Sequence, residues 1–228
     1  MSKEMNELFS DIHKKYDFMN RMLSLGMDGI WRSDAAKEAV VAKSRYRVLD
    51  VATGTGELAM AIRRESERQG KEAEIIGVDF NKDMLGIARK KAERQKIPIR
   101  FELGDALDLR FKGDSFDVLT SGFALRDFDS LEGFVKEAHR VLKKGGRIIL
   151  MDMSRPERGF NKYFFKFYSR VMLLEGMLVD RNAYSFLVKS IRGFDRENAA
   201  SLLERNGFSA VKIRELPTGV AFIITATK

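Results

Sequence analysis

The residues of this chain that most directly indicate chemistry are two carboxylates and a glycine-rich turn. Residues 48–57 read Val-Leu-Asp-Val-Ala-Thr-Gly-Thr-Gly-Glu, so an apolar strand ends in Asp50 and leads into Gly54 and Gly56. After a helical stretch, a second apolar strand ends in Asp79. Glycines let the backbone approach a ligand closely, and a carboxylate at the end of the second strand can accept hydrogen bonds from both vicinal hydroxyls of a ribose. The pattern therefore predicts a site for a cofactor that contains a nucleoside.

Asp50 distinguishes between the two classes of cofactor that such a turn can bind. The residues from Gly54 to Ala59 also satisfy the fingerprint of dinucleotide-binding proteins, so the glycines alone do not decide. A carboxylate four residues before the first glycine would repel a dinucleotide pyrophosphate, whereas it would attract the ammonium or sulfonium group of S-adenosylmethionine. We therefore predict S-adenosylmethionine as the cofactor.

Two other classes of protein stand as alternatives. An NAD(P)-dependent oxidoreductase of the short-chain type would need a Tyr and a Lys four residues apart, but Tyr163 and Lys166 are three apart. A non-catalytic interaction module would have no need of the intact acids and glycines of the turn.

Further candidate contacts follow the strands at the same edge of the expected sheet. The carboxyl ends of parallel strands meet at one edge, where ligands bind. Asp105 follows the third strand and could accept from an adenine amino group, Gly122 follows the fourth strand, and Phe80 follows Asp79 directly. A single acid could be only a helix cap or a turn residue, but three acids that each end an apolar strand favour a cofactor site.

The elements that would hold these residues alternate between strand and helix. The expected strands are residues 47–51, 74–79, 99–103, 117–121 and 147–153, and the expected helices between them are 57–69, 83–95 and 131–142. This alternation predicts an α/β fold, a mostly parallel sheet with helices on both faces. We expect Lys143–Gly146 to close the helix before it, with cations at its negative end and glycine in the left-handed conformation.

Both ends of the chain depart from this alternation. Residues 5–43 have a helical pattern, which we expect Gly26 and Gly29 to interrupt. A helix near 195–206 and two β-rich runs, 210–215 and 220–227, predict a C-terminal antiparallel hairpin at the sheet edge. We expect one domain, 1–228, with four parts: an N-terminal helical cap (1–44), a cofactor-binding core (45–156), a substrate or lid segment (157–194) and a C-terminal helix and hairpin (195–228).

The composition of the chain limits the classes of protein to which it can belong. The chain has 228 residues, 44% of them hydrophobic, which suits one α/β domain. It has no cysteine and only two histidines, so a disulfide framework, a cysteine nucleophile and a zinc or other metal site are not expected. The N-terminus lacks the apolar core of a signal peptide, and no apolar run reaches the ~18 residues of a membrane span, so we expect a cytoplasmic protein. The net charge of +8 is spread along the chain, which argues against a nucleic-acid partner.

Several short motifs give the chain a resemblance to a known family. The motifs are Tyr16–Asn20, Ser24–Gly26, Trp31–Arg32, Phe123–Arg126 and Arg140–Gly146. In these, and nearly end to end, the chain resembles the ubiquinone/menaquinone biosynthesis (demethylmenaquinone) C-methyltransferases. The resemblance implies a class I methyltransferase fold and the methylation of a ring carbon of a prenylated quinol, with demethylmenaquinol as the expected acceptor. It also implies cofactor contacts at Thr55, Asp79, Asp105, Ala106 and, as a fifth position, Gly122.

The chain departs from the family's pattern at positions that bear on the acceptor. The family usually has Arg-Asn where this chain has Arg126-Asp127, and His-Arg where it has Asp28-Gly29. Asp152 replaces a typical Glu, which preserves the charge. The first two departures lie in segments expected to face the substrate. Another small or isoprenoid acceptor is therefore an alternative within the same class of enzyme.

The catalytic candidates follow from what ring methylation requires. A ring carbon becomes nucleophilic when its neighbouring hydroxyl is deprotonated, so we expect Arg126 to stabilise the phenolate charge and Asp127 to relay a proton through water. The alternative for this pair is an exposed Arg–Asp contact after a strand. Tyr16 and Asn20 share one helix face and are expected near the substrate, unless they serve only in helix packing. We expect His139 to be a solvated helix residue rather than a base.

One basic and aromatic segment suggests where the enzyme works. Lys162, Lys166 and Arg170 recur every four residues, beside Phe164 and Phe167. Such a helix can lie transiently at a bilayer surface or line a tunnel for a prenyl tail; alternatively, it packs on the sheet edge with its lysines reaching solvent. The location we expect is thus the cytoplasm, with peripheral contact at the inner face of the membrane. A homo-oligomer is compatible with the sequence.

Overall fold

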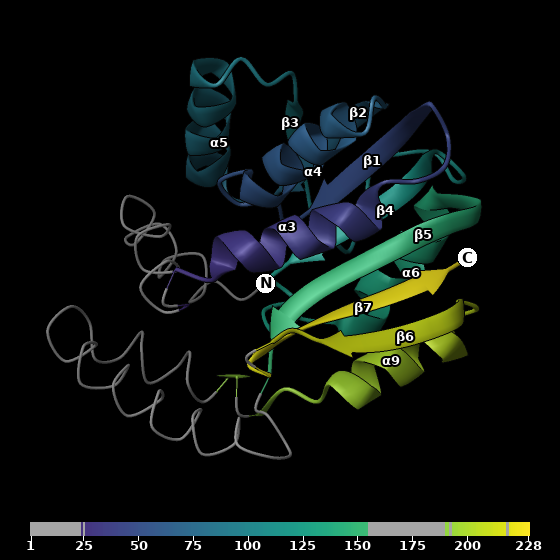
Figure 1. The fold of residues 1–228 in the computed structure, drawn as a ribbon. Coiled ribbons are helices and arrows are strands. Elements are labelled where there is room, and N and C mark those ends of the chain that lie inside the picture. Colours follow the sequence, from purple (N-terminus) through teal and green to yellow (C-terminus); the bar gives the residue numbers. More distant parts are fainter. Residues whose placement is uncertain (1–23, 25, 155–189, 192, 218) are drawn as a thin grey trace, which may run out of the picture.

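One mixed sheet organises the molecule (Figure 1). The computed structural model describes residues 24, 26–154, 190–191, 193–217 and 219–228. Within these, seven strands form a sheet of order β3-β2-β1-β4-β5-β7-β6. The first five are parallel to one another, and β7 is antiparallel to both β5 and β6. The predicted α/β fold is confirmed.

The elements agree with the expected alternation to within a few residues, except at β5. The helices are α3 (Asp28–Ala39), α4 (Glu57–Arg68), α5 (Lys82–Arg94), α6 (Leu131–Val141) and α9 (Arg196–Arg205). The strands are β1 (Arg45–Val51), β2 (Glu72–Asp79), β3 (Arg100–Leu103), β4 (Phe116–Gly122), β5 (Leu142–Met153), β6 (Ser209–Glu215) and β7 (Ala221–Thr227).

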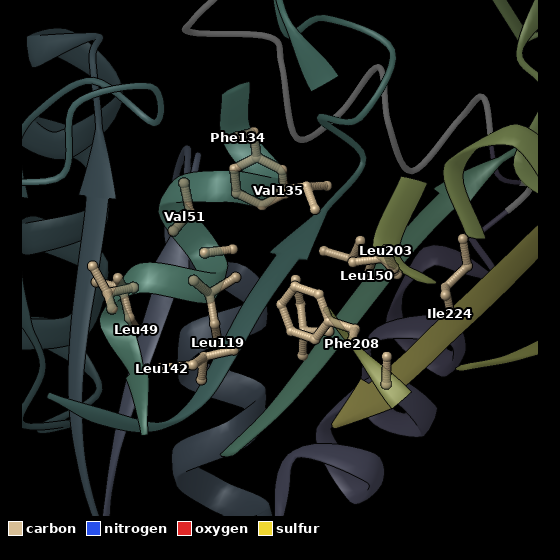
Figure 2. Packing of buried hydrophobic residues seen from close by; sticks show 14 of the residues in the cluster. Leu49, Val51, Leu119, Phe134, Val135, Leu142, Leu150, Leu203, Phe208 and Ile224 are labelled. Carbon is tan, nitrogen blue, oxygen red and sulfur yellow. The ribbon is translucent and has the colours of Figure 1, made fainter. Parts of the chain in front are cut away.

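The central strands are apolar on both sides because helices cover both faces of the sheet. Neighbouring residues are apolar in pairs: Val48 and Leu49, Ile75 and Ile76, Val118 and Leu119. Successive side chains of a strand point to opposite faces. The first of each pair packs in the core beneath α3 and α4, and the second in the core beneath α6 and α9, part of which Figure 2 shows. This continuous apolar pattern is what a parallel sheet buried on both faces requires.

Helix α3 packs beside α4 in the core on the same face of the sheet. Trp31, Ala35 and Ala39 are buried against α4 and the sheet. Gly29 lies inside the first turn of α3, so the expectation that Gly29 interrupts the helical run is wrong. Burial of the Trp31 side chain stabilises the helix by more than the ~1 kcal/mol that a helical glycine costs.

The end of α6 differs from the predicted glycine cap. The helix ends at Val141, and Leu142 is already extended and begins β5. Lys143 binds Asp117 of β4 at 2.8 Å, and the Gly145 amide donates to the Lys228 carbonyl. These tertiary contacts draw the segment into the sheet, so it does not close the helix.

The C-terminal hairpin is present, as predicted, and contributes to the core. Strand β7 lies between β5 and β6, and its Phe222 and Ile224 are buried. Asp195 caps α9 by accepting from the Asn198 amide. Most of the predicted substrate segment, 157–194, lies outside the described residues.

The order of the strands fixes where a ligand can bind. The chain runs from β1 outward to β2 and β3, then crosses to β4 on the other side of β1. In open α/β sheets the crevice outside the carboxyl ends of strands at such a reversal is the ligand site. Here that point lies between β1 and β4.

Candidate cofactor and active site

Two neighbouring cavities, here called the two lobes of one cleft, lie at this point of the sheet. Both lobes are lined by Ala52, Gly54, Gly122 and Phe123, which therefore lie at their junction. The first lobe has a cavity volume of about 150 Å³ and is lined further by Val78, Asp79, Phe80, Asn81, Met84, Gly104, Asp105, Ala106, Leu107, Ala124, Asp127, Phe128 and Asp129. The second is lined further by Arg32, Asp50, Thr53, Thr55, Glu57 and Leu58. One buried water needs only ~10–15 Å³ by this measure, so the first lobe has room for an organic ligand.

The two predicted glycines of the turn have different roles. Gly54 has a φ of +54°, and a Cβ there would meet nothing within 4 Å, so the turn faces open space in the cleft. Gly56 precedes α4 with a φ of +80°, and a Cβ there would lie 2.9 Å from the Phe101 ring. Gly56 therefore allows the turn before α4 to lie close against the Phe101 ring of β3. It is not among the described residues that line either lobe.

Asp79 holds the turn in place from the end of β2. One carboxylate oxygen accepts from the Gly54 amide at 2.7 Å and the other from the Asn81 amide at 2.9 Å. Burial raises the pKa of Asp79 to about 6, and the hydrogen bonds oppose that shift. A carboxylate offers about four acceptor positions, so Asp79 can also accept from ribose hydroxyls in the first lobe.

Asp50 occupies the wall of the second lobe. Its two oxygens accept from the hydroxyls of Thr120 and Thr53, each at 2.6 Å. Thr120 lies opposite Asp50 in the register of β1 and β4. Burial raises the pKa of Asp50 to about 6, and the two hydroxyls lower it. The buried carboxylate lies where the sequence predicts it, beside the turn.

Part of the first lobe's lining suits a flat apolar ring with a polar edge. Val78, Met84 and Leu107 supply apolar wall. Asp105 is exposed and accepts from the Leu107 amide at 2.9 Å, so it is a turn residue as well as a candidate contact for an adenine amino group. Ala106, also predicted, lines the same lobe.

Arg126 is buried in an ion pair with Asp152, not exposed beside Asp127. Its Nε lies 2.7 Å from an Asp152 oxygen, and the exposed fractions of the two side chains are 5% and 0%. The second Asp152 oxygen accepts from the Leu125 amide, and Arg126 donates to the Ser190 hydroxyl. The alternative of an exposed Arg126–Asp127 contact is therefore wrong. Arg126 is not among the described residues that line the lobes.

Asp127 lines the first lobe near the end of β4. Burial raises the pKa of its carboxyl to about 6; the positive charge of Arg126 lowers it, and the negative charge of Asp152 raises it. Since this pKa lies close to neutrality, Asp127 can exchange a proton with a group bound in the cleft.

Sequence reasoning missed many of the residues that line the cleft, among them Ala52, Phe123 and Arg32. Ala52 and Phe123 adopt left-handed backbone conformations, with φ of +53° and +62°, at the junction of the lobes. Such conformations cost non-glycine residues ~1–2 kcal/mol and cluster at functional sites. The guanidinium of Arg32 lies over the Phe123 ring, 5.2 Å from its centroid. The motifs Trp31–Arg32 and Phe123–Arg126 were visible, but no sequence pattern predicts the direction of these side chains.

Some predicted residues lie elsewhere. Tyr16 and Asn20, and the basic segment 162–170, fall outside the described residues. His139, on α6, is half-buried and packs edge-on against Phe208, with ring centroids 5.2 Å apart, so it is only partly solvated, and it lines neither lobe of the cleft. Among the described residues, no cluster of acids and histidines could hold a metal ion, and no helix is long and apolar enough to cross a bilayer.

Comparison with known proteins gives one consistent result. The model of the ubiE/COQ5 methyltransferase family matches residues 1–228. A demethylmenaquinone methyltransferase of Deinococcus radiodurans is 41% identical over 219 residues, 94% of this chain and 88% of that protein. Another, of Thermus thermophilus, is 37% identical over 220 residues, 95% of this chain and 97% of that protein.

A solved structure shows the same fold. An S-adenosylmethionine-dependent methyltransferase of Thermotoga maritima superposes with a TM-score of 0.69, covering 98% of this chain and 99% of that one at 21% identity. The fold is thus that of the class I methyltransferases, as the resemblance implied.

Proposed function

The chain belongs to the ubiE/COQ5 methyltransferase family, and from this premise we propose that it methylates a ring carbon of a prenylated quinol, with demethylmenaquinol as the acceptor. It is an enzyme that depends on S-adenosylmethionine. The names of both relatives support this acceptor. The observation that carries the proposal is the cleft at the β1–β4 crossover. Its first lobe is lined both by the residues of a nucleoside-type site and by the half-buried carboxyl of Asp127.

The described residues fit the cofactor. The open space at Gly54 accepts its ribose and sulfur region, Asp79 the ribose hydroxyls, and Asp105 the adenine edge. Phe80, Ala106 and Gly122 line the same lobe, whereas Asp50 and Thr55 line the second lobe, where the methionine part would lie. When bound, S-adenosylmethionine supplies a methyl group already activated by its sulfonium.

The residues beyond β4 would prepare the acceptor. Asp127 receives the proton of the quinol hydroxyl, through water, so that electron density reaches the neighbouring ring carbon, which bonds to the methyl group as the carbon–sulfur bond breaks. The ring carbon then loses its own proton to water, and Asp127 returns the first proton to the quinol oxygen, which restores the carboxylate. Arg126, which Asp152 holds in place, lies near enough to Asp127 to act on it, and its positive charge would stabilise the negative charge that develops on the quinol oxygen. Tyr16 and Asn20 remain candidates for contact with the quinol.

A second acceptor is favoured by one specific observation. Asp127 places a carboxylate in the cleft where the family pattern has an amide, which changes the charge that the acceptor meets. A small or isoprenoid acceptor with a hydrogen-bond donor at this point is therefore the other candidate. The comparisons give no support to an oxidoreductase.

Transfer of a labelled methyl group tests the proposal. The purified protein is given methyl-labelled S-adenosylmethionine with demethylmenaquinol, with a ubiquinol precursor that lacks the ring methyl, or with a mixed lipid extract. We expect label in menaquinol, bound to ring carbon and stable to hydrolysis. Label in the extract but in neither quinol would favour the second acceptor. No label in any of the three would contradict the proposal.

A further inference from the structure

The second lobe of the cleft carries charges of both signs. Asp50 and Glu57 are its acids, and Arg32 is the only cation among the described residues that line it. Glu57 is paired with Lys91, with Nζ and Oε1 2.7 Å apart, whereas Asp50 is held by neutral hydroxyls. A lobe with an unneutralised acid on one wall and a cation on another suits a zwitterion.

Arg32 is fixed in orientation by its neighbours. Its Nη1 contacts a carboxylate oxygen of Asp28, one helical turn earlier on α3. The other Asp28 oxygen accepts from the Ser24 hydroxyl at 3.0 Å. The exposed fraction of the Arg32 side chain is 11%, and its guanidinium lies over the Phe123 ring. Arg32 is thus a preorganised group of the lobe wall, not a side chain that moves freely in solvent.

The guanidinium retains capacity for a second anion. It has five N–H donors in a planar fork that matches a carboxylate. Phe123 and Gly122 extend from the end of β4 to the junction of the lobes, so a ligand that crosses this junction reaches Arg32. Arg32 also lies close enough to Asp50 to lower its pKa.

We propose that Arg32 binds the carboxylate of the methionine part of the cofactor, and that Asp28 is the positioning residue that aims it. The ammonium then faces Asp50. This inference rests on the proposed function only for its cofactor and not for its acceptor, so it can fail while the methyltransferase activity stands.

Calorimetry with a matched pair of ligands tests the assignment. S-adenosylmethionine and its decarboxylated analogue differ only in the carboxylate, and 5′-methylthioadenosine lacks the whole amino-acid part. The wild type should bind the decarboxylated analogue about 10- to 100-fold more weakly, the range for a lost charged hydrogen bond. Arg32→Gln should bind the two at nearly equal affinity and should bind methylthioadenosine as the wild type does.

Three further variants separate this role from general effects. Arg32→Lys keeps the charge but lacks the planar guanidinium, and Asp28→Asn removes the ion pair that orients Arg32. In both variants the ratio of the two affinities should therefore lie between those of the wild type and Arg32→Gln. Arg68→Gln removes an equal charge from a side chain that is 67% exposed on α4, and should leave the ratio unchanged. An unchanged ratio of the two affinities in Arg32→Gln, with methylthioadenosine still bound, would overturn the assignment and point to backbone amides instead. If Arg32→Gln did not fold, an unchanged ratio in both Arg32→Lys and Asp28→Asn would decide against it.

Discussion

Three carboxyls around the cleft, two of them buried and the third half-buried, have their pKa shifted in the same direction. Burial raises the pKa of Asp50, Asp79 and Asp127 to about 6 in each case. When no ligand is bound, the ionised forms of these carboxyls are therefore destabilised near neutral pH. A cofactor that carries a sulfonium and an ammonium offsets this destabilisation when it binds. The acids that the sequence singles out thus favour a positively charged ligand over a pyrophosphate.

Asp127 should give the reaction a pH dependence that its amide variant lacks. Asp127→Asn can still bind a water or a hydroxyl, as the family's usual residue would, so we expect its turnover to fall only about 10-fold, compared with about 100-fold or more for Asp127→Ala. The wild-type rate should rise through a pH of about 6, where this carboxyl ionises, and that step should vanish in the amide variant. A pH–rate profile measured with saturating cofactor checks this.

The same variant should be more stable at neutral pH. The folded pKa of about 6 lies above the unfolded value near 3.9, so the folded state binds more protons between these values. The stability contribution of Asp127 is therefore greatest at low pH and falls as the pH rises through 6. Thermal unfolding of Asp127→Asn should show a gain of about 1 kcal/mol at pH 7.5, roughly 2–4 °C, and none near pH 4. An equal gain at both values would contradict the shifted pKa.

The pair of Arg126 and Asp152 should couple stability to activity. Arg126→Met leaves the Asp152 carboxylate buried without its cation, which typically costs 3–5 kcal/mol. The double variant Arg126→Met with Asp152→Asn removes the charge and keeps an acceptor for the Leu125 amide, so it should recover much of the stability. Its methyl transfer should remain low while cofactor affinity stays near wild type. Recovery of turnover together with stability would show that Arg126 serves the fold alone.

At the scale of elements, the two glycines of the turn between β1 and α4 have different roles, one in ligand binding and one in packing. Gly54 faces the open cleft, whereas Gly56 lies against the Phe101 ring of β3. Both have positive φ, so an alanine at either position is strained to a similar degree. What differs is the surroundings, and the two alanine variants are therefore matched controls for each other.

Gly54→Ala should weaken cofactor binding, and Gly56→Ala should destabilise the fold. A methyl group at Gly54 enters the space that the ligand occupies, so we expect affinity to fall about 10-fold or more, with roughly 1 kcal/mol lost in stability. A methyl group at Gly56 must displace Phe101, and overpacking of this kind adds about 1–3 kcal/mol to the strain. Calorimetric titration and denaturant unfolding of both variants measure the two effects. The reverse pattern would contradict the roles assigned to the two glycines.

At the scale of the whole molecule, what could be predicted was local, and what could not depended on the register of the sheet. The strand-end acids Asp50 and Asp79 follow from apolar patterning and side-chain chemistry within a few residues. The Arg126–Asp152 pair joins residues 26 apart through the pairing of β4 with β5, which no local pattern contains. The early start of β5 depends likewise on contacts with Asp117 and the C-terminus. Arg32 lies over the ring of Phe123, a residue 91 positions later whose left-handed conformation non-glycine residues rarely adopt.

The net charge of the molecule bears on how it would reach a quinol held in a bilayer. We predict from the sequence that Lys162, Lys166 and Arg170 supply a basic stripe beside aromatic residues. Each basic residue near an anionic surface contributes about 1 kcal/mol, screened within a Debye length. Changing all three to Gln should therefore reduce binding to anionic vesicles, chiefly at low salt, while activity on a short-tailed soluble quinol persists.

A charge-matched variant decides whether that effect belongs to the stripe or to net charge alone. Arg68, Arg100 and Lys136 are each more than 60% exposed on α4, β3 and α6, and changing them to Gln lowers the net charge from +8 to +5, as the stripe variant does. If the protein reaches the bilayer through the stripe, this control should sediment with vesicles nearly as the wild type does. Equal losses in both variants would show that diffuse attraction is sufficient. No loss in the stripe variant would place membrane contact elsewhere on the molecule, because a prenylated acceptor still requires the enzyme to reach the bilayer.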